Sequence, residues 1–140
     1  MKTILFNTLA VILGLVFGSV VNMSLVSLGT ELIAAPAGTD VSTMESLAQT
    51  MHLFEPKHFL FPFLAHAVGT FAGAMLATKI ASSHQFKIAM FIGVAFLAGG
   101  ISMVLSLPSP MWFNVVDLVV AYLPMAYLGY KLVSNKKAEG

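Results

Sequence analysis

Four polar side chains interrupt long apolar runs of this sequence, and they are the residues best placed to do chemistry. They are Asn22, His66, Ser102 and Asp117. An imidazole or a carboxylate is expensive to place inside a membrane and usually marks an ion, proton or ligand site. His66 and Asp117 could together hold a proton, a cation or a small polar molecule, with Asn22 and Ser102 nearby. In the alternative interpretation the four residues only join helices, at roughly 0.6–2 kcal/mol per hydrogen bond.

A second polar group, His52, Glu55 and His58, forms the pattern H-x-x-E-x-x-H. Imidazole and carboxylate groups together could bind Zn²⁺ or another divalent cation. The spacing differs from H-E-x-x-H, in which two histidines four residues apart share one helix face. Pro56 is expected to interrupt the helix between them, so polar residues at the start of a helix are the alternative interpretation. The sequence indicates no cofactor other than this metal.

Long apolar segments must position these side chains. Of the 140 residues, 58% are hydrophobic and 9% are charged, against roughly 25% charged in a soluble domain. A helix needs about 20 apolar residues to cross a hydrocarbon core. Four segments meet this length, at residues 4–28, 59–80, 88–107 and 111–133. The sequence therefore predicts one all-α membrane domain over residues 1–140, a four-transmembrane-helix antiparallel bundle.

The lysines predict how these segments are oriented. Six of the seven fall on one side of a four-span topology, and only Lys57 falls on the other. The positive-inside rule then places both termini in the cytoplasm, and the expected location is a bacterial inner membrane. The residues assigned to the inner side are Lys2, Lys79, Lys87, Lys131, Lys136, Lys137 and Glu139.

The longest connection follows the first segment and is expected to face outward. Its second half is interpreted as a short amphipathic helix at about residues 43–54, because apolar residues recur at helical spacing from Met44 to Phe54. Ser42 and Glu45 fit a capping box, in which side-chain oxygens accept hydrogen bonds from free backbone amides. In the last segment a proline, Pro124, is expected to kink the helix.

Depth and spacing predict that the four intramembrane polar residues form one layer. At a rise of 1.5 Å per residue, each lies ~8–12 Å below the outer end of its segment. Small residues share a helix face with each of them, and such faces mark close approaches between membrane helices. The expected packing residues are Gly14, Gly18, Gly69 and Gly73, with Ala95, Ala98 and Gly99 preceding Ser102. These faces exceed what one monomer needs, so a homo-oligomer is expected.

Three functions are compatible with these patterns. The leading hypothesis is a non-enzymatic protein, surrounded by membrane lipid, whose outer polar layer binds or conducts a proton, a cation or a small polar ligand. The second is an accessory subunit of a larger membrane complex. The third is a membrane enzyme, or a metal or haem protein, that uses His52, Glu55, His58 and His66. Nucleic acid is excluded as a partner, because a net charge of +1 provides too few cations for phosphate contacts.

Overall fold

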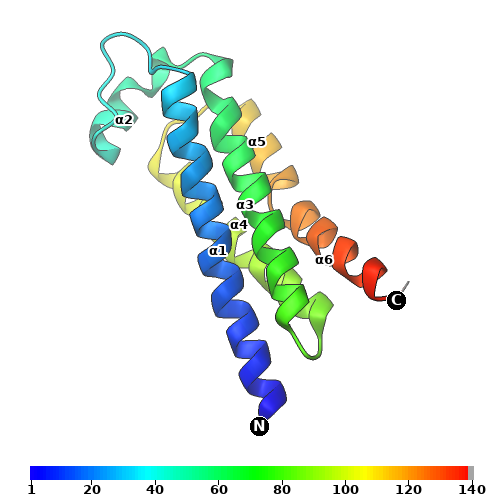
Figure 1. The fold of residues 1–140 in the computed structure, drawn as a ribbon. Coiled ribbons are helices and arrows are strands. Elements are labelled where there is room, and N and C mark those ends of the chain that lie inside the picture. Colours follow the sequence, from blue (N-terminus) through cyan, green and yellow to red (C-terminus); the bar gives the residue numbers. More distant parts are fainter. Residues whose placement is uncertain (139–140) are drawn as a thin grey trace.

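The computed structural model of the chain describes the backbone of residues 1–138 and the side chains of residues 1–135. All secondary structure in this part is helical (Figure 1). Four segments are long and apolar enough to cross a membrane, namely Lys2–Leu32, Pro56–Ile80, Gln85–Ser106 and Met111–Asn135. The prediction of an all-helical protein with four such segments is confirmed. Lys136, Lys137 and Glu139, assigned above to the inner side, lie outside the described side chains.

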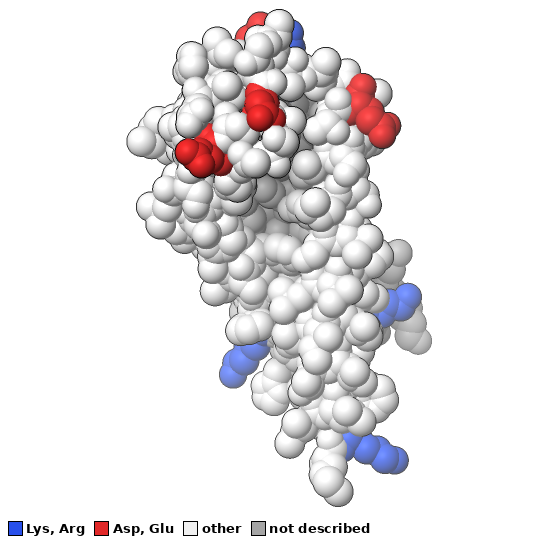
Figure 2. Space-filling view, turned by 90° about the vertical axis from the view of Figure 1, so that its left-hand side faces the viewer, with Lys and Arg blue, Asp and Glu red and all other residues white. Residues whose placement is uncertain are grey.

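The elements in chain order are α1 (Lys2–Leu32), α2 (Met44–Thr50), the 3₁₀ turns η1 (Met51–Leu53) and η2 (Pro56–Phe59), α3 (Leu60–Ile80), α4 (Gln85–Ser106), α5 (Met111–Val120) and α6 (Leu123–Ala138). Both termini lie toward one end of the bundle, and α2 lies at the other (Figure 1). Acidic side chains gather at the α2 end, and lysines gather at the opposite end (Figure 2). We call these the α2 end and the lysine end. The α2 end also carries Lys57 in η2.

Glycines bring α1 and α3 into close contact. A Cβ atom added to Gly14 would lie 2.8 Å from the carbonyl oxygen of Gly73, and one added to Gly73 would lie 2.6 Å from that of Gly14. Gly18 and Gly69 repeat the arrangement, with distances of 2.7 Å and 2.9 Å to each other's carbonyl oxygens. The four glycines that the sequence analysis expected to mark packing faces therefore meet each other within one chain.

Replacing Gly73 by valine is expected to lower the free energy of unfolding by about 1–3 kcal/mol, as overpacking generally does. The added side chain would collide with the backbone of α1. Gly99 offers a matched control, because a Cβ atom added there meets nothing within 4 Å. Unfolding of Gly73→Val and Gly99→Val in the same lipid or detergent tests the contact. Equal losses in both variants would show that the α1–α3 contact is not responsible, since valine has a higher helix propensity than glycine.

The fourth long segment is broken between α5 and α6, at Ala121 and Tyr122, just before Pro124. Proline has no backbone N–H, and its ring displaces the carbonyl group four residues earlier, that of Val120. The predicted kink is confirmed. The break also turns the ring of Tyr122 into the protein, where the residue is 1% exposed.

The segment between α1 and α3, which contains α2, covers one end of the bundle. The N-terminus of α2 differs from the prediction. Thr43 is the N-cap: its hydroxyl accepts the N–H of Ser46 at 3.1 Å, and the Ser46 hydroxyl accepts the N–H of Thr43 at 3.2 Å. The predicted capping box of Ser42 and Glu45 is wrong, because the Ser42 N–H already donates to the Asp40 carboxylate at 2.9 Å. The helix is also shorter than predicted and continues as the 3₁₀ turn η1.

Three apolar clusters fill the bundle, and one of them, formed by Ala67, Ala121 and Tyr122, lies at the break between α5 and α6. At the α2 end, Met51, Phe59 and Phe113 are buried together. Toward the lysine end the interior is filled mainly by small residues, and the buried members are Ala10, Ala74, Ala77, Ala81, Ile88, Ala89, Ile92 and Ala126. The helices therefore approach closely at the lysine end, whereas larger side chains separate them at the α2 end.

Candidate functional site

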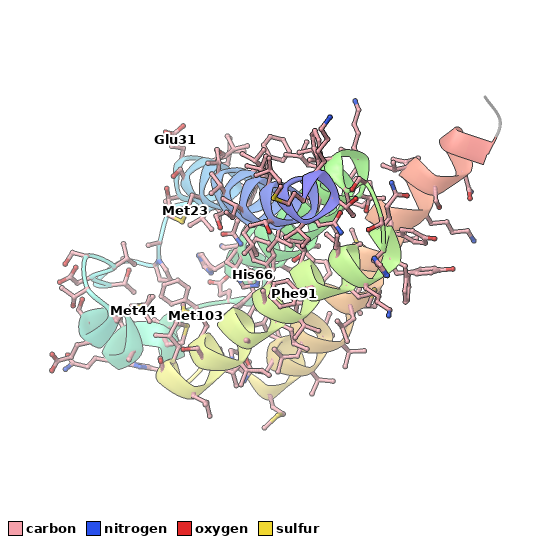
Figure 3. The ribbon with its side chains drawn as sticks, turned by 90° about the horizontal axis from the view of Figure 1, so that it is seen from below. Met23, Glu31, Met44, His66, Phe91 and Met103 are labelled. Carbon is pink, nitrogen blue, oxygen red and sulfur yellow. The ribbon has the colours of Figure 1, made fainter. Side chains whose placement is uncertain are left out.

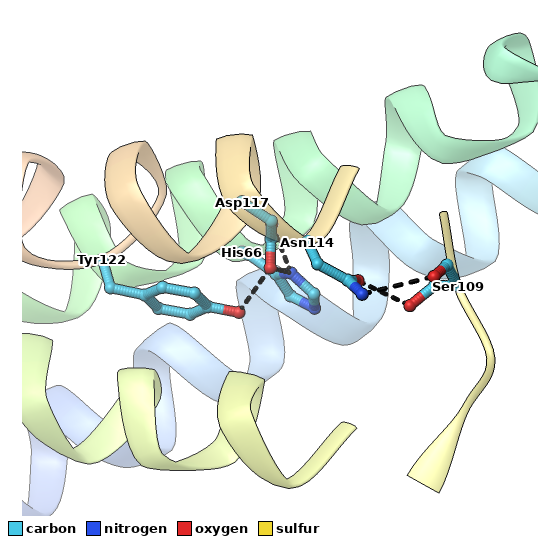
Figure 4. Close-up of polar contacts among 5 residues, drawn as sticks. All are labelled: His66, Ser109, Asn114, Asp117 and Tyr122. Atoms are coloured by element: carbon cyan, nitrogen blue, oxygen red, sulfur yellow. Dashed lines mark hydrogen bonds and ion pairs between the residues drawn. The ribbon is translucent and has the colours of Figure 1, made fainter. Parts of the chain in front are cut away.

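His66 on α3 and Asp117 on α5 meet inside the bundle (Figure 4). Nδ1 of His66 lies 2.8 Å from one carboxylate oxygen of Asp117 and 3.0 Å from the other. The Asp117 side chain is 3% exposed and the His66 side chain is 21% exposed. The two side chains that the sequence suggested could act together are thus in direct contact, and the imidazole remains accessible on one side.

Tyr122 adds a second donor to the carboxylate. Its hydroxyl donates to Oδ2 of Asp117 at 3.0 Å, and its ring stacks on that of His66 with centroids 5.6 Å apart. In an unbroken helix Tyr122 would point about 140° away from Asp117, five residues earlier, so spacing alone did not reveal the contact. The helix break before Pro124 brings the two side chains together. Pro124 was the one sequence signal that could have suggested it.

These hydrogen bonds determine what the His66 ring can do. A carboxylate only accepts hydrogen bonds, so Nδ1 of His66 carries the hydrogen and donates it to Asp117. The neutral ring then has its acceptor lone pair on Nε2, the arrangement by which a carboxylate orients an imidazole toward a ligand. No described residue is hydrogen-bonded to Nε2. This atom is therefore free to bind a further molecule.

A cavity of about 230 Å³ opens beside the pair, and we call it the chamber. Most of its wall is apolar, including Met51, Phe59, Met103, Val104, Leu107 and Phe113. The polar lining residues are His58, His66, Ser109, Asn114 and Asp117. Seen along the bundle, His66 lies among the long helices, whereas Glu31 and Met44 lie at the outer edge of the molecule (Figure 3). The chamber is thus an apolar space with one polar wall.

Asn114 and Ser109 hold the turn that closes the chamber beside α5. The Ser109 hydroxyl donates to Oδ1 of Asn114 at 2.6 Å, and Nδ2 of Asn114 donates to the Ser109 carbonyl oxygen at 3.2 Å (Figure 4). The sequence interpretation missed Asn114, because it considered one polar residue per segment. The available signal was its position three residues before Asp117, which places both on one helix face.

Ser102 is not part of this cluster, which corrects the expectation of a four-residue layer. It is exposed on α4, and it lies about 200° around the helix from Gly100, which lines the chamber. Of the three small residues used to choose its face, Ala98 and Gly99 are exposed as well, and Ala95 is half-buried. The depth estimate alone could not identify the buried face. The close approach of α4 occurs instead at Gly93, where an added Cβ atom would lie 2.7 Å from Cβ of Ala126.

Asn22 lies close to the chamber without lining it. It is half-buried on α1, and its Cβ atom would be 3.0 Å from a Cβ atom added to Gly69. Val26, one turn further along α1, does line the chamber. Asn22 therefore contributes to the packing of α1 on α3 and does not reach the His66–Asp117 pair.

His52, Glu55 and His58 do not converge on a common point. Nδ1 of His58 accepts the backbone N–H of Glu55 at 2.9 Å, and the Glu55 carboxylate pairs with Lys57 at 3.0 Å. The hydrogen bond and charge of Lys57 lower the pKa of Glu55 below its ordinary value. Within the described part of the chain, no three His, Cys, Asp or Glu side chains are grouped to hold a metal ion. The metal-site interpretation has no geometric support.

Comparisons with family models, with characterised proteins and with solved structures find no match to this chain. What the site can do follows from its own geometry. A buried carboxylate holds two donors, an imidazole presents a free Nε2, and an apolar chamber lies beside them.

Proposed function

We propose that this chain is an integral membrane protein that binds a small amphipathic molecule in the chamber, with the polar group of that molecule hydrogen-bonded to Nε2 of His66. The observation that carries the proposal is an apolar chamber ending at a buried carboxylate that is paired with a half-buried imidazole. Small-molecule sites typically combine apolar walls with a few precisely placed polar groups. A site with mostly apolar walls and one polar group favours a ligand that is itself soluble in lipid.

The proposed orientation places the lysine end in the cytoplasm and the α2 end outside, with the four long helices alternating in direction. Lys2, Lys79, Lys87 and Lys131 belong to the lysine end, and Lys57 to the α2 end. An excess of lysine on one side of the spans supports a cytoplasmic location for that side. The chamber then lies in the outer half of the bilayer, where a ligand from the outer leaflet can enter it.

Binding is favoured over conduction of a proton or a cation. Both oxygens of Asp117 already accept hydrogen bonds, from His66 and Tyr122. Beyond Tyr122, toward the lysine end, the interior is filled by the small-residue cluster, with Ile92 fully buried. A conducting pore is instead lined by polar groups that replace the hydration shell of the ion. These features support a site that is closed on the lysine side.

One observation favours the alternative role of a subunit in a larger assembly or homo-oligomer. Ala98, Gly99 and Ser102 form an exposed face of small residues on α4. Such residues allow the backbone of another membrane helix to approach closely. The face lies opposite the chamber, so an assembly role and ligand binding are compatible in one protein.

Native mass spectrometry of the protein extracted with its own membrane lipids tests the proposal. The wild-type chain is expected to retain a small molecule that His66→Gln largely loses. The occupancy in the variant should be lower by on the order of tenfold, because one oriented hydrogen bond to the ligand is lost. Glutamine can still donate to Asp117 but presents no ring acceptor toward the chamber. Ser102→Ala is the control and is expected to retain the molecule. Equal occupancy in His66→Gln would refute the proposal, and a co-purifying heteromeric partner would favour the assembly role.

A further inference from the structure

A second cavity continues the chamber between α1 and the segment that precedes α3. It has a volume of about 400 Å³, and we call it the groove. It shares Val26, Leu47, Phe54, His58 and Pro62 with the lining of the chamber. The space-filling view shows a hollow beneath the acidic α2 end on this side of the molecule (Figure 2). Chamber and groove are therefore neighbouring parts of one binding space.

The two parts differ in their buried polar groups: Asp117 and Asn114 line the chamber, whereas none of the described polar residues that line the groove is buried. This difference divides a ligand into a head and a tail. The chamber alone, at about 230 Å³, is smaller than the ~300–1,000 Å³ of typical small-molecule sites. Chamber and groove together fall within that range. The buried polar groups face the chamber, whereas Val26, Ile33, Val41 and Phe61 are among the apolar residues of the groove. A polar head would occupy the chamber, and an apolar tail would lie in the groove.

The charges around the chamber select a neutral head. Among the described residues that line chamber or groove there is no lysine, and Asp117 is the one carboxylate. An anionic head would be repelled by Asp117 and would find no lysine to pair with. A cationic head would compete with His66 and Tyr122 for oxygens that already accept hydrogen bonds. Burying a charge without a partner is costly, so a neutral head is favoured.

Two imidazole nitrogens define the hydrogen-bonding pattern of that head. Nε2 of His66 accepts, as argued above. Nδ1 of His58 accepts the N–H of Glu55, so the ring hydrogen of His58 is on Nε2, which donates. A hydroxyl group can donate to His66, and an oxygen of the same head can accept from His58. Phe59 and Phe113, whose ring centroids are 4.8 Å apart, provide aromatic walls for a flat ring.

From these constraints we infer that the ligand is a neutral phenol or quinol with an apolar tail. Its ring hydroxyl donates to Nε2 of His66, its ring lies beside Phe59 and Phe113, and its tail occupies the groove. The inference rests on the proposed function of the chamber and concerns binding alone.

Trp112 provides the readout. It is the one tryptophan of the sequence, and its ring lies 5.8 Å from that of Phe59 and 5.9 Å from that of Phe113, centroid to centroid. Both phenylalanines line the chamber, so occupation of the chamber changes the surroundings of the indole. The full-length protein in nanodiscs of zwitterionic lipid can be titrated with decylphenol, decylbenzene, decanoic acid and decylamine.

Decylphenol is expected to bind on the order of tenfold more tightly than decylbenzene, which lacks the hydroxyl, and more tightly than the acid and the amine. His66→Gln should abolish the preference for the phenol, and His84→Gln, at the lysine end, should preserve it. Equal or tighter binding of the acid or the amine would overturn the inference while leaving the proposed function intact. No binding of any of the four would also overturn it; the mass measurement on native lipid then decides separately whether the proposed function survives.

Discussion

His66→Leu is expected to lower the free energy of unfolding by about 3 kcal/mol, because it leaves the buried carboxylate of Asp117 with one donor, the hydroxyl of Tyr122. A hydrogen bond between membrane helices contributes only about 0.6–2 kcal/mol. Most of the loss therefore comes from the unpaired charge. Removing the acid as well, in His66→Leu/Asp117→Leu, should recover most of the stability, since a buried pair can often be replaced by apolar residues at little cost.

A double-mutant cycle measured by reversible unfolding in one lipid or detergent tests this prediction. His52→Leu is the matched control, because His52 is an exposed histidine at the α2 end. It should change the unfolding free energy by no more than about 0.5 kcal/mol, as surface substitutions usually do. A double variant that is less stable than either single variant would show that the two side chains do not depend on each other.

Val104→Phe is expected to weaken ligand binding by at least about tenfold, because overpacking a filled site costs about 1–3 kcal/mol. Val104 lines the chamber, whose volume is about 230 Å³, and a phenyl ring there occupies the space of the ligand head. Since the empty chamber has room for the ring, the unfolding free energy should change little. The variant thus separates binding from stability, in contrast to His66→Leu.

The neighbouring residue provides the control for this substitution. Leu105 is 83% exposed, so Leu105→Phe adds the same ring to the outer surface of α4. Dissociation constants for decylphenol, measured through Trp112 fluorescence, should be unchanged in Leu105→Phe and raised in Val104→Phe. Similar constants in both variants would mean that the chamber is not where the ligand binds.

The helices and the His66–Asp117 contact could be anticipated from the sequence for the same physical reason. Hydrocarbon offers no hydrogen bonds, so a spanning backbone must satisfy itself as a helix, and a buried imidazole or carboxylate must find a partner in the protein. Because His66 and Asp117 lie at similar depths on two helices, each was the nearest available partner for the other. Ser102 could not be placed this way, because a serine hydroxyl satisfies itself locally and tolerates an outward position.

Other features depended on competition between neighbours that spacing does not resolve. Ser42 and Thr43 are both residue types that are favoured at the N-cap. Thr43 is the N-cap because the Ser42 N–H already donates to the Asp40 carboxylate. Tyr122 reaches Asp117 only because α5 ends before Pro124. The chamber exists because large side chains keep the helices apart at the α2 end. These side chains come from several helices, so no single segment of the sequence predicts the chamber.

An experimental density map of the protein prepared with its own membrane lipids tests the central claim most directly. The expected result is density inside the chamber within hydrogen-bond distance of Nε2 of His66, continuing into the groove beside α1. A chamber filled by the protein's own side chains, or a His66 ring turned away from Asp117, would contradict the account.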